Sequence, residues 1–138
     1  MAVDYFHLKL TPDALGSISV LGLAHMGDSV FEILVRGWLC AHGRETSANL
    51  HRATVSYVSA PAQARLVDRL LPLLTEEEQG YYRRGRNAHV HAVPKNATAG
   101  EYGKATGLEC LLGALWLSGR TERINELFCA VMEEENAV

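Results

Sequence analysis

Residues 102–117, YGKATGLECLLGALWL, are the stretch that decides the fold. Lys104 and Glu109 are its only charged residues, and most of the others are apolar or glycine. The stretch contains no proline, and a helix drawn through it is apolar on nearly every side. We therefore expect a helix from about Tyr102 to about Leu117, which Ser118-Gly119 ends because glycine tolerates the closing conformation.

Residues 18–41, ISVLGLAHMGDSVFEILVRGWLCA, are the second long apolar stretch, and they also lack proline. We expect a helix from about Ile18 to about Ala41. Ser17 is a plausible N-cap for this helix, since a serine side chain can accept a hydrogen bond from a first-turn N–H group. His42-Gly43 is expected to end the helix.

Shorter helices are predicted from their start signals, which are cap residues, early prolines and one capping box. The signals lie at Thr11-Pro12, Thr46-Ser47, Ser59-Ala60-Pro61, Thr75 to Glu78, and Thr121. The stretch from Asn87 to Gly100 is predicted to be a loop, and no segment shows the clear alternation of a strand. The sequence therefore predicts an all-α protein, a bundle of helices joined by short loops.

Length and composition limit the class of protein. A chain of 138 residues, 48% hydrophobic and 21% charged, suits one domain over residues 1–138. No apolar run approaches the roughly 18 residues of a membrane span, and the first ten residues lack the pattern of a signal peptide. Cys40, Cys110 and Cys129 contain no CxxC pair, which argues against a disulfide framework or a zinc site. We expect a cytoplasmic protein that has no membrane partner.

The charges are distributed unevenly along the chain. The net charge is −3, but residues 81–104 hold five basic residues against one acidic, a net +4. The rest of the chain holds eight basic and fifteen acidic residues, a net −7. A basic island on an acidic body is typical of a phosphate-binding surface. The alternative is a solvated loop with scattered charges.

Two carboxylates lie on the two long apolar helices. Helical spacing places Asp28 and Glu109 among apolar neighbours, where a lone ionised carboxylate is costly unless a cation compensates it. The neighbours are Ala24, Phe31 and Val35 for Asp28, and Ala105, Leu112 and Trp116 for Glu109. Two facing carboxylates with water suit Mg²⁺. The alternative is that each carboxylate pairs with an arginine or caps a neighbouring helix.

Glycines accompany both carboxylates. Gly27 precedes Asp28, and Gly107 and Gly113 flank Glu109. A glycine in a helix costs about 1 kcal/mol relative to alanine, so it is often kept where a ligand or another backbone comes close. These glycines can equally provide space for helix packing.

These same segments carry a family resemblance. Residues 24–31, AHMGDSVF, resemble the Gly-Asp-Ser signature helix of the ribonuclease III domain, and residues 109–115, ECLLGAL, resemble the second signature of that family, Glu-Ala-Leu-x-Gly-Ala. Between them, residues 82–88, YRRGRNA, and 93–96, VPKN, resemble the compact subfamily called Mini-ribonuclease III. The four segments agree in order and spacing, from about residue 18 to about residue 134.

The resemblance implies a fold, an activity and a site. The fold is an all-helical ribonuclease III catalytic (endonuclease) domain that forms a homodimer, with one valley that binds double-stranded RNA. The activity is that of a magnesium-dependent endoribonuclease in which Mn²⁺ can substitute, with Asp28 and Glu109 as the catalytic and metal-binding residues. The compact subfamily lacks a separate RNA-binding domain and acts on precursor large-subunit (23S) ribosomal RNA, so a ribosomal subunit or a ribosomal protein would be a further partner.

Two positions depart from the wider ribonuclease III pattern. Ala24 replaces a glutamate four residues before Asp28, and Thr106 replaces an aspartate three residues before Glu109. The compact subfamily resembles this chain in the reduction from four acidic ligands to two. The departures leave open how many metal ions bind, and Thr106 could offer its hydroxyl to a water molecule on the metal.

Double-stranded RNA is bound mostly through phosphates and 2′-hydroxyls. The predicted RNA-binding residues are Arg83, Arg84, Arg86 and Lys95 for phosphates, and Asn87 and Asn96 for sugar hydroxyls. Lys104 lies about 140° round the helix from Glu109, so only its long stem could bring it to RNA or to the metal site. For Arg83, a structural role at a helix end is the alternative.

Three other functions compete with the endoribonuclease. The first is a non-catalytic RNA-binding protein on the same fold, which the presence of both carboxylates disfavours. The second is a helical oligomerisation module, which would leave Asp28, Glu109 and the basic island without a role. The third is a metal-dependent phosphohydrolase of small nucleotides, a class that usually needs more His and Asp ligands.

Overall fold

The described part of the molecule is a bundle of helices. The computed structural model describes residues 2–43, 46–88 and 95–136, and no strand occurs within these ranges. The elements are η1 (Tyr5–His7), α1 (Pro12–Gly16), α2 (Val20–Ala41), α3 (Ser47–Val58), α4 (Ala60–Leu70), η2 (Leu71–Leu73), α5 (Glu76–Arg86), α6 (Ala99–Leu117) and α7 (Thr121–Asn136). The prediction of an all-α fold is confirmed.

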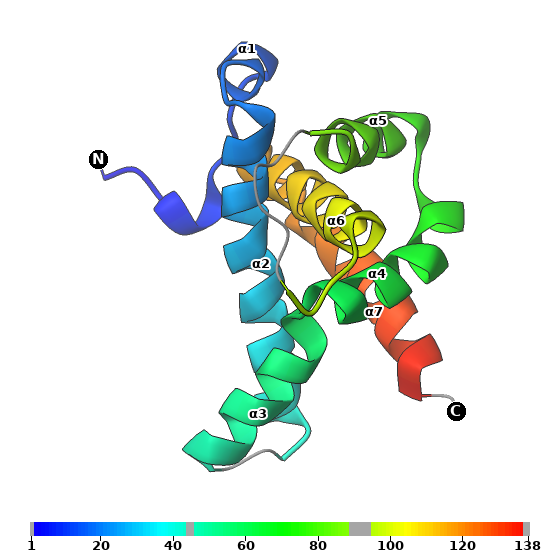
Figure 1. The fold of residues 1–138 in the computed structure, drawn as a ribbon. Helices are drawn as coiled ribbons and strands as arrows, with labels where there is room; N and C mark the ends of the chain where they lie inside the picture. The colour runs from blue at the N-terminus through cyan, green and yellow to red at the C-terminus, as the bar shows by residue number, and fades with distance from the viewer. Residues whose placement is uncertain (1, 44–45, 89–94, 137–138) are drawn as a thin grey trace.

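Helix α6 lies at the centre of the bundle (Figure 1). α2, α4, α5 and α7 all pack against it, and α3 packs on α2 and α4. Leu111 and Leu115 of α6 are completely enclosed, and Cys110 is as well. The near-absence of a polar face on residues 102–117 is explained by this position, because neighbours cover the helix on most sides.

Most of the predicted start signals are confirmed. Thr11, Thr46, Ser59 and Thr75 each accept a hydrogen bond from a first-turn N–H group, and Thr75 forms a full capping box with Glu78. Helix α6 begins at Ala99 rather than at Tyr102, since Thr98 and Glu101 form a second capping box. Residues 89–94 of the predicted loop lie outside the described residues.

Two of the predicted caps are wrong. Ser19, not Ser17, caps α2 by accepting a hydrogen bond from Gly22 N–H, whereas Ser17 closes the preceding short helix α1. Thr121 is the first residue inside α7, and the carbonyl oxygen of Arg120 accepts the first hydrogen bond of that helix. In both places two neighbouring residues compete for one position, which local sequence does not resolve.

Helices α2 and α6 cross with their backbones in contact. A Cβ atom built on Gly27 would overlap the carbonyl group of Glu109 and lie 2.8 Å from its Cα. A Cβ atom on Gly113 would overlap the carbonyl oxygen of Leu23 and lie 3.1 Å from the nitrogen of Gly27. Only glycine fits at these two positions, so the pair sets how closely the helices approach. Both interpretations of Gly27 and Gly113 describe this contact, because another backbone comes close and the glycines leave the space in which the two helices pack.

A second glycine crossing joins α5 to α6. A Cβ atom on Gly85 would lie 2.7 Å from the carbonyl oxygen of Thr106, and one on Gly107 would lie 2.8 Å from the carbonyl oxygen of Tyr82. The ring of Tyr82 packs in the space that Gly107 leaves open, and Tyr82 is buried. Helix α6 is therefore held against both α2 and α5 at backbone contact.

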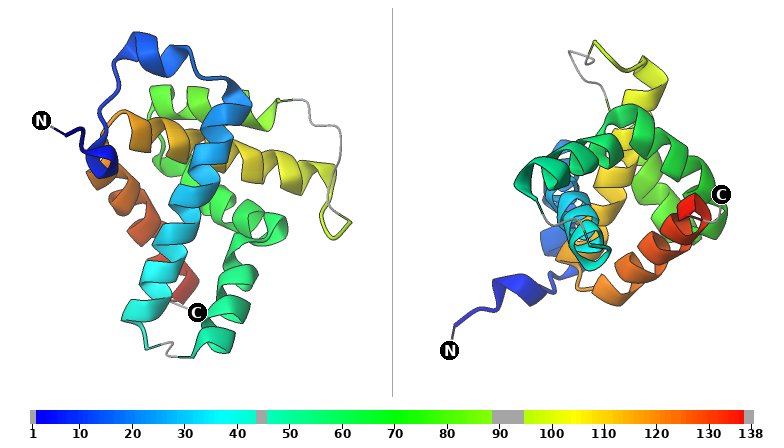
Figure 2. Two further views of the ribbon diagram at one scale, coloured as in Figure 1. Left: turned by 90° about the vertical axis from the view of Figure 1, so that its left-hand side faces the viewer. Right: turned by 90° about the horizontal axis from the view of Figure 1, so that it is seen from below.

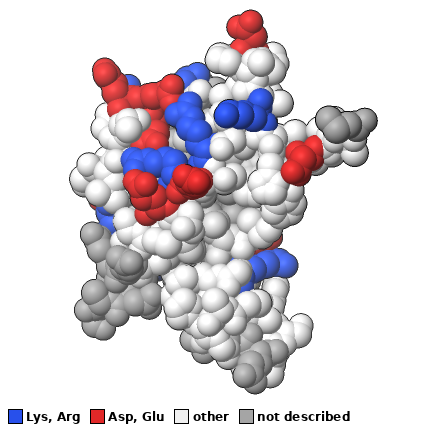
Figure 3. Space-filling view, turned by 180° about the vertical axis from the view of Figure 1, so that it is seen from behind, with Lys and Arg blue, Asp and Glu red and all other residues white. Residues whose placement is uncertain are grey.

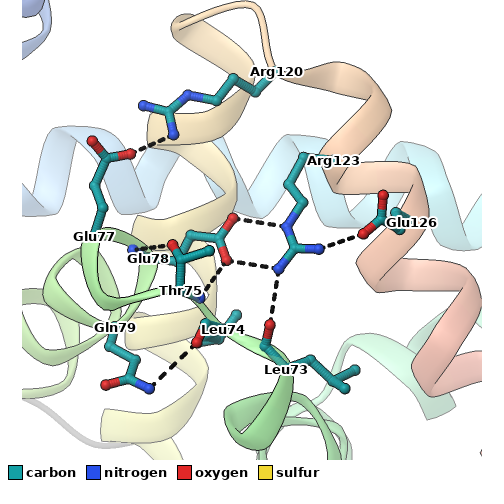
Figure 4. Close-up of polar contacts among 9 residues, drawn as sticks. All are labelled: Leu73, Leu74, Thr75, Glu77, Glu78, Gln79, Arg120, Arg123 and Glu126. Atoms are coloured by element: carbon teal, nitrogen blue, oxygen red, sulfur yellow. Dashed lines mark hydrogen bonds and ion pairs between the residues drawn. The ribbon is translucent and has the colours of Figure 1, made fainter.

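One ion-pair network ties α5 and η2 to α7 (Figure 4). The guanidinium of Arg123 donates 2.9 Å hydrogen bonds to both carboxylate oxygens of Glu78 and to the carbonyl oxygen of Leu73, and it also bonds to Glu126. Arg120 pairs with Glu77 beside it. The Glu78 side chain is only 3% exposed, and the hydrogen bonds from Arg123 are the largest influence that lowers its pKa.

The glycine crossing predicts opposite effects for two substitutions on the same helix. Gly27→Ala should lower the free energy of unfolding by about 2–4 kcal/mol, because α2 and α6 must separate. Gly37→Ala, on the same helix with nothing within 4 Å of the added Cβ, should raise it by about 0.5–1 kcal/mol through helix propensity. Urea denaturation of both variants measures this, and equal effects would contradict the crossing.

The buried ion pair predicts a pH-dependent loss of stability. Glu78→Gln should cost roughly 2–4 kcal/mol at neutral pH, because it leaves Arg123 without its charged partner. Since the folded-state pKa of Glu78 lies below the ordinary value of 4.5, this cost should persist above pH 4.5 and disappear as the pH falls through the lowered pKa. Urea denaturation across this pH range is the measurement. Glu126→Gln, at a side chain that is 69% exposed, is the control and should change little; a pH-independent cost for Glu78→Gln would contradict the prediction.

Candidate active site

The crossing of α2 and α6 brings Asp28 and Glu109 together. Asp28 directly follows Gly27, and the backbone of Glu109 is the surface against which Gly27 packs. The two carboxylates are close enough for charge repulsion and for a hydrogen bond between them. The prediction that both belong to one shared site therefore agrees with the geometry.

Glu109 has a strongly perturbed pKa. Burial raises the pKa most, the neighbouring Asp28 raises it further, and the side-chain amide of Gln63 lowers it in part, so the pKa is about 8. An ionised Glu109 is thus disfavoured at neutral pH in the metal-free protein. Such a carboxyl group is ready to ionise when a cation approaches.

No basic side chain in the described ranges forms an ion pair with Asp28 or Glu109. The alternative in which each carboxylate pairs with an arginine is therefore not found there. Ala24, Phe31 and Val35 are buried apolar residues, but Asp28 itself is exposed. The expectation that apolar surroundings make its charge costly is therefore wrong, because its side chain reaches solvent. This exposure gives the site an open side.

The positions that depart from the ribonuclease III pattern supply no carboxylate. Ala24 is buried, and the hydroxyl of Thr106 donates a 2.9 Å hydrogen bond to the carbonyl oxygen of Tyr102. In the described ranges no group of three or more His, Cys, Asp or Glu residues could hold a metal ion. Two carboxylates, one of them uncompensated and one open to water, fit a hydrated magnesium ion, which needs few protein ligands.

A third polar residue, Gln63 on α4, lies at this site and was not among the predicted site residues. It is 2% exposed, and its side chain contacts the carboxylate of Glu109. The signal was present: Gln63 lies at helical spacing from Leu66, Val67 and Leu70, all of which are buried. A polar residue on the apolar face of a helix is the same pattern that selected Asp28 and Glu109.

The predicted RNA-binding residues gather at one end of α5. Arg83, Arg84, Arg86 and Asn87 are all exposed at or just after its last turn. Arg84 lies over the ring of Tyr81, 4.6 Å from its centre, and its Nε donates to the carbonyl oxygen of Gly80. Aromatic stacking holds the guanidinium in place while leaving this side chain on the surface.

Lys95 and Asn96 lie in the turn before α6, where both are exposed. This turn projects beyond the helices at the same end of the molecule as the end of α5 (Figure 2). Lys104 behaves differently: its Nζ donates a 2.7 Å hydrogen bond to Asp68 of α4, and it is not among the groups that shift the pKa of Glu109. The structure therefore places Lys104 beside Asp68, close to Tyr82 and Arg86, rather than at the carboxylates.

The view from behind shows a different kind of surface (Figure 3). On that face, basic and acidic side chains lie next to one another and form no continuous basic area. Ion pairs such as Arg120 with Glu77 and Arg123 with Glu126 have the same mixed character. Mixed charges of this kind attract a phosphate backbone less than a surface of one sign does.

The fold and the paired carboxylates define a class of protein. Residues 21–120 match the model of the ribonuclease III domain, which covers most of the chain. The fold is also similar to a crystal structure of a Fusobacterium nucleatum protein, with a TM-score of 0.77 and 27% identity, covering 85% of this chain and 95% of that one. The chain therefore has the ribonuclease III catalytic fold.

Closer relatives narrow the family. The chain is 44% identical to Mini-ribonuclease 3 of Symbiobacterium thermophilum over 113 residues, which is 82% of this chain and 87% of that protein. It is 42% identical to Mini-ribonuclease 3 of a Thermoanaerobacter species over 128 residues, 91% of this chain and 90% of that protein. The chain belongs to the Mini-ribonuclease 3 family and is an endoribonuclease of the ribonuclease III type.

The raised pKa of Glu109 predicts a stability cost that grows with pH. In EDTA, the free energy of unfolding should fall between about pH 4.5 and pH 8, because the unfolded chain ionises Glu109 more readily than the folded protein does. Glu109→Gln should remove this contribution and stabilise the metal-free protein by a few kcal/mol at pH 8. Urea denaturation at several pH values compares the two proteins. A variant that is less stable at pH 8 than the parent would show that Glu109 is compensated in the metal-free fold.

Proposed function

We propose that this endoribonuclease cleaves double-stranded RNA with Mg²⁺, or Mn²⁺ in its place, held between Asp28 and Glu109. The observation that carries the proposal is a half-buried glutamate with a pKa of about 8, which lies beside a second carboxylate and has no basic partner among the described residues. Such an arrangement is costly for folding and is relieved by a divalent cation. The resemblance to ribonuclease III implies a divalent cation at these two carboxylates.

Each carboxylate has a distinct task in this mechanism. When bound, the cation lowers the pKa of water and polarises the phosphate. Glu109, half-buried on α6, would give up its proton to solvent and hold the cation through its carboxylate. Asp28, which is exposed, would supply the second carboxylate to the cation from the solvent side.

The proposed RNA surface runs from the end of α5 to the turn before α6. Arg83, Arg84 and Arg86 would bind phosphates with Lys95, and Asn87 and Asn96 would reach sugar hydroxyls. These RNA-binding roles are supported by the exposure of the six residues at one end of the molecule, next to the helix that carries Glu109. Lys104 pairs with Asp68, so we assign it an indirect role in RNA binding. In this role it shapes the surface around Arg86 and does not bind a phosphate itself.

We propose that the active form is a homodimer, because a single small domain presents a short basic surface and two copies would extend it along a duplex. Helix α2 is a candidate interface, since Leu21 and Ile33 on it are 45% and 49% exposed.

The natural substrate that we propose, from the family resemblance, is precursor large-subunit (23S) ribosomal RNA in the cytoplasm, with the ribosomal subunit or a ribosomal protein as a partner. Among the described helices, none is both long and apolar enough to cross a membrane.

The two-carboxylate site predicts that cleavage depends on both residues. Asp28→Asn and Glu109→Gln should each slow the cleavage of a long double-stranded RNA in Mg²⁺ by at least roughly a hundredfold. Both variants should keep the far-ultraviolet circular dichroism of the parent. Cleavage by the parent in EDTA is the metal control, and near-normal turnover by either variant would end the proposed assignment.

The basic residues predict a change in the salt dependence of binding. Arg84→Ala and Lys95→Ala should each weaken binding to duplexes of any sequence and reduce the slope of log affinity against log salt by about 0.7–0.9. Lys9→Ala is the matched control, since Lys9 packs on Gly119 at the other end of α6. Catalytically inactive Asp28→Asn protein serves as the background for these measurements. An unchanged slope for both test variants, or an equal change for Lys9→Ala, would contradict the proposed surface.

A further inference from the structure

Gln63 is the most deeply buried polar side chain near the two carboxylates. It lies in the first turn of α4, is 2% exposed, and is one of only four buried polar or charged residues among those that the structure describes. The other three are Thr54, Glu78 and Thr106. Each of these three has its side-chain oxygen atoms in hydrogen bonds.

The orientation of the Gln63 amide is set by its neighbours. Its Nε2 donates a 2.9 Å hydrogen bond to the carbonyl oxygen of Val58, at the end of α3. A carbonyl oxygen can only accept, so the nitrogen and not the oxygen must face Val58. The same side chain also favours the ionised form of Glu109, as an N–H donor beside a carboxylate does.

This arrangement leaves the Oε1 atom of Gln63 without a partner. In the described part of the chain it is the only buried side-chain nitrogen or oxygen with no hydrogen bond. A buried amide oxygen with no donor is unfavourable, and such an atom beside a functional site points to a ligand. Because the amide of Gln63 contacts the Glu109 carboxylate, this unpartnered oxygen belongs to a side chain of the same site.

We propose that Gln63 is the third oxygen donor of the cation site, which holds the Glu109 carboxylate through its N–H group and offers Oε1 to the hydrated cation. The inference rests on the proposed cation site at Asp28 and Glu109. Amide oxygen is a hard donor of the kind that suits Mg²⁺ and Mn²⁺. A neutral third donor adds no further negative charge to a site where two carboxylates already repel one another.

The test measures cation binding directly, without RNA. Mn²⁺ is titrated into the 138-residue chain by isothermal titration calorimetry, and unfolding temperatures are recorded in EDTA and in Mn²⁺. Gln63→Met keeps the length of the side chain but removes both amide atoms, and Gln63→Asn withdraws the amide by one methylene. Thr54→Val is the matched control, because Thr54 is buried to a similar extent but bonds only within its own helix.

We expect Gln63→Met to weaken Mn²⁺ binding by about tenfold or more and to reduce the rise in unfolding temperature on adding Mn²⁺. Gln63→Asn should weaken Mn²⁺ binding in the same way, and it replaces Gln63→Met in the test if that variant fails to fold. Thr54→Val should keep the Mn²⁺ affinity of the parent. Parent-like affinity in a folded Gln63 variant would overturn the inference. Asp28→Asn distinguishes a failure of the Gln63 assignment from a failure of the cation site. If Asp28→Asn and the Gln63 variants all bind Mn²⁺ like the parent, the proposed cation site itself is wrong. If only Asp28→Asn loses Mn²⁺ binding, the cation site stands and only the role of Gln63 is refuted.

Discussion

The backbone contact between α2 and α6 is the constraint on which the rest of the structure depends. Gly27 and Gly113 let the two helices approach until a Cβ atom on either would overlap a carbonyl group of the partner. Each glycine destabilises its helix by about 1 kcal/mol relative to alanine. The close approach that the glycines allow offsets this cost through dense packing around α6. Because Asp28 follows Gly27 and Gly27 packs on the backbone of Glu109, this contact also brings together the two carboxylates of the proposed active site.

Two glutamates in this small protein, the buried Glu78 and the half-buried Glu109, differ in what their surroundings do to their charge. Glu78 has Arg123 against both of its oxygens, and its pKa is lowered. Glu109 has a second carboxylate beside it, and its pKa is raised to about 8. The first stabilises the joint between α5 and α7, whereas the second weakens the metal-free fold. A residue that destabilises the folded protein and makes no compensating structural contact is typical of a catalytic site.

Sequence patterns predicted much of this and missed specific parts for physical reasons. The helices at residues 18–41 and 102–117 were predictable because long apolar runs leave few other arrangements, and the glycines beside Asp28 and Glu109 indicated a close approach. The cap at Ser19 was not, since two serines compete within three residues. The pairing of Lys104 with Asp68 and of Gln63 with Glu109 depends on how α4 packs on α6, which no local pattern contains.

The central claim is that the crossing of α2 and α6 creates one divalent-cation site. Anomalous diffraction from crystals of the protein soaked in Mn²⁺ tests it most directly, because the anomalous signal locates the ion independently of activity. The account predicts a peak within coordination distance of both the Asp28 and Glu109 carboxylates. A peak held by other side chains, with Asp28 and Glu109 contacting only each other, would contradict it.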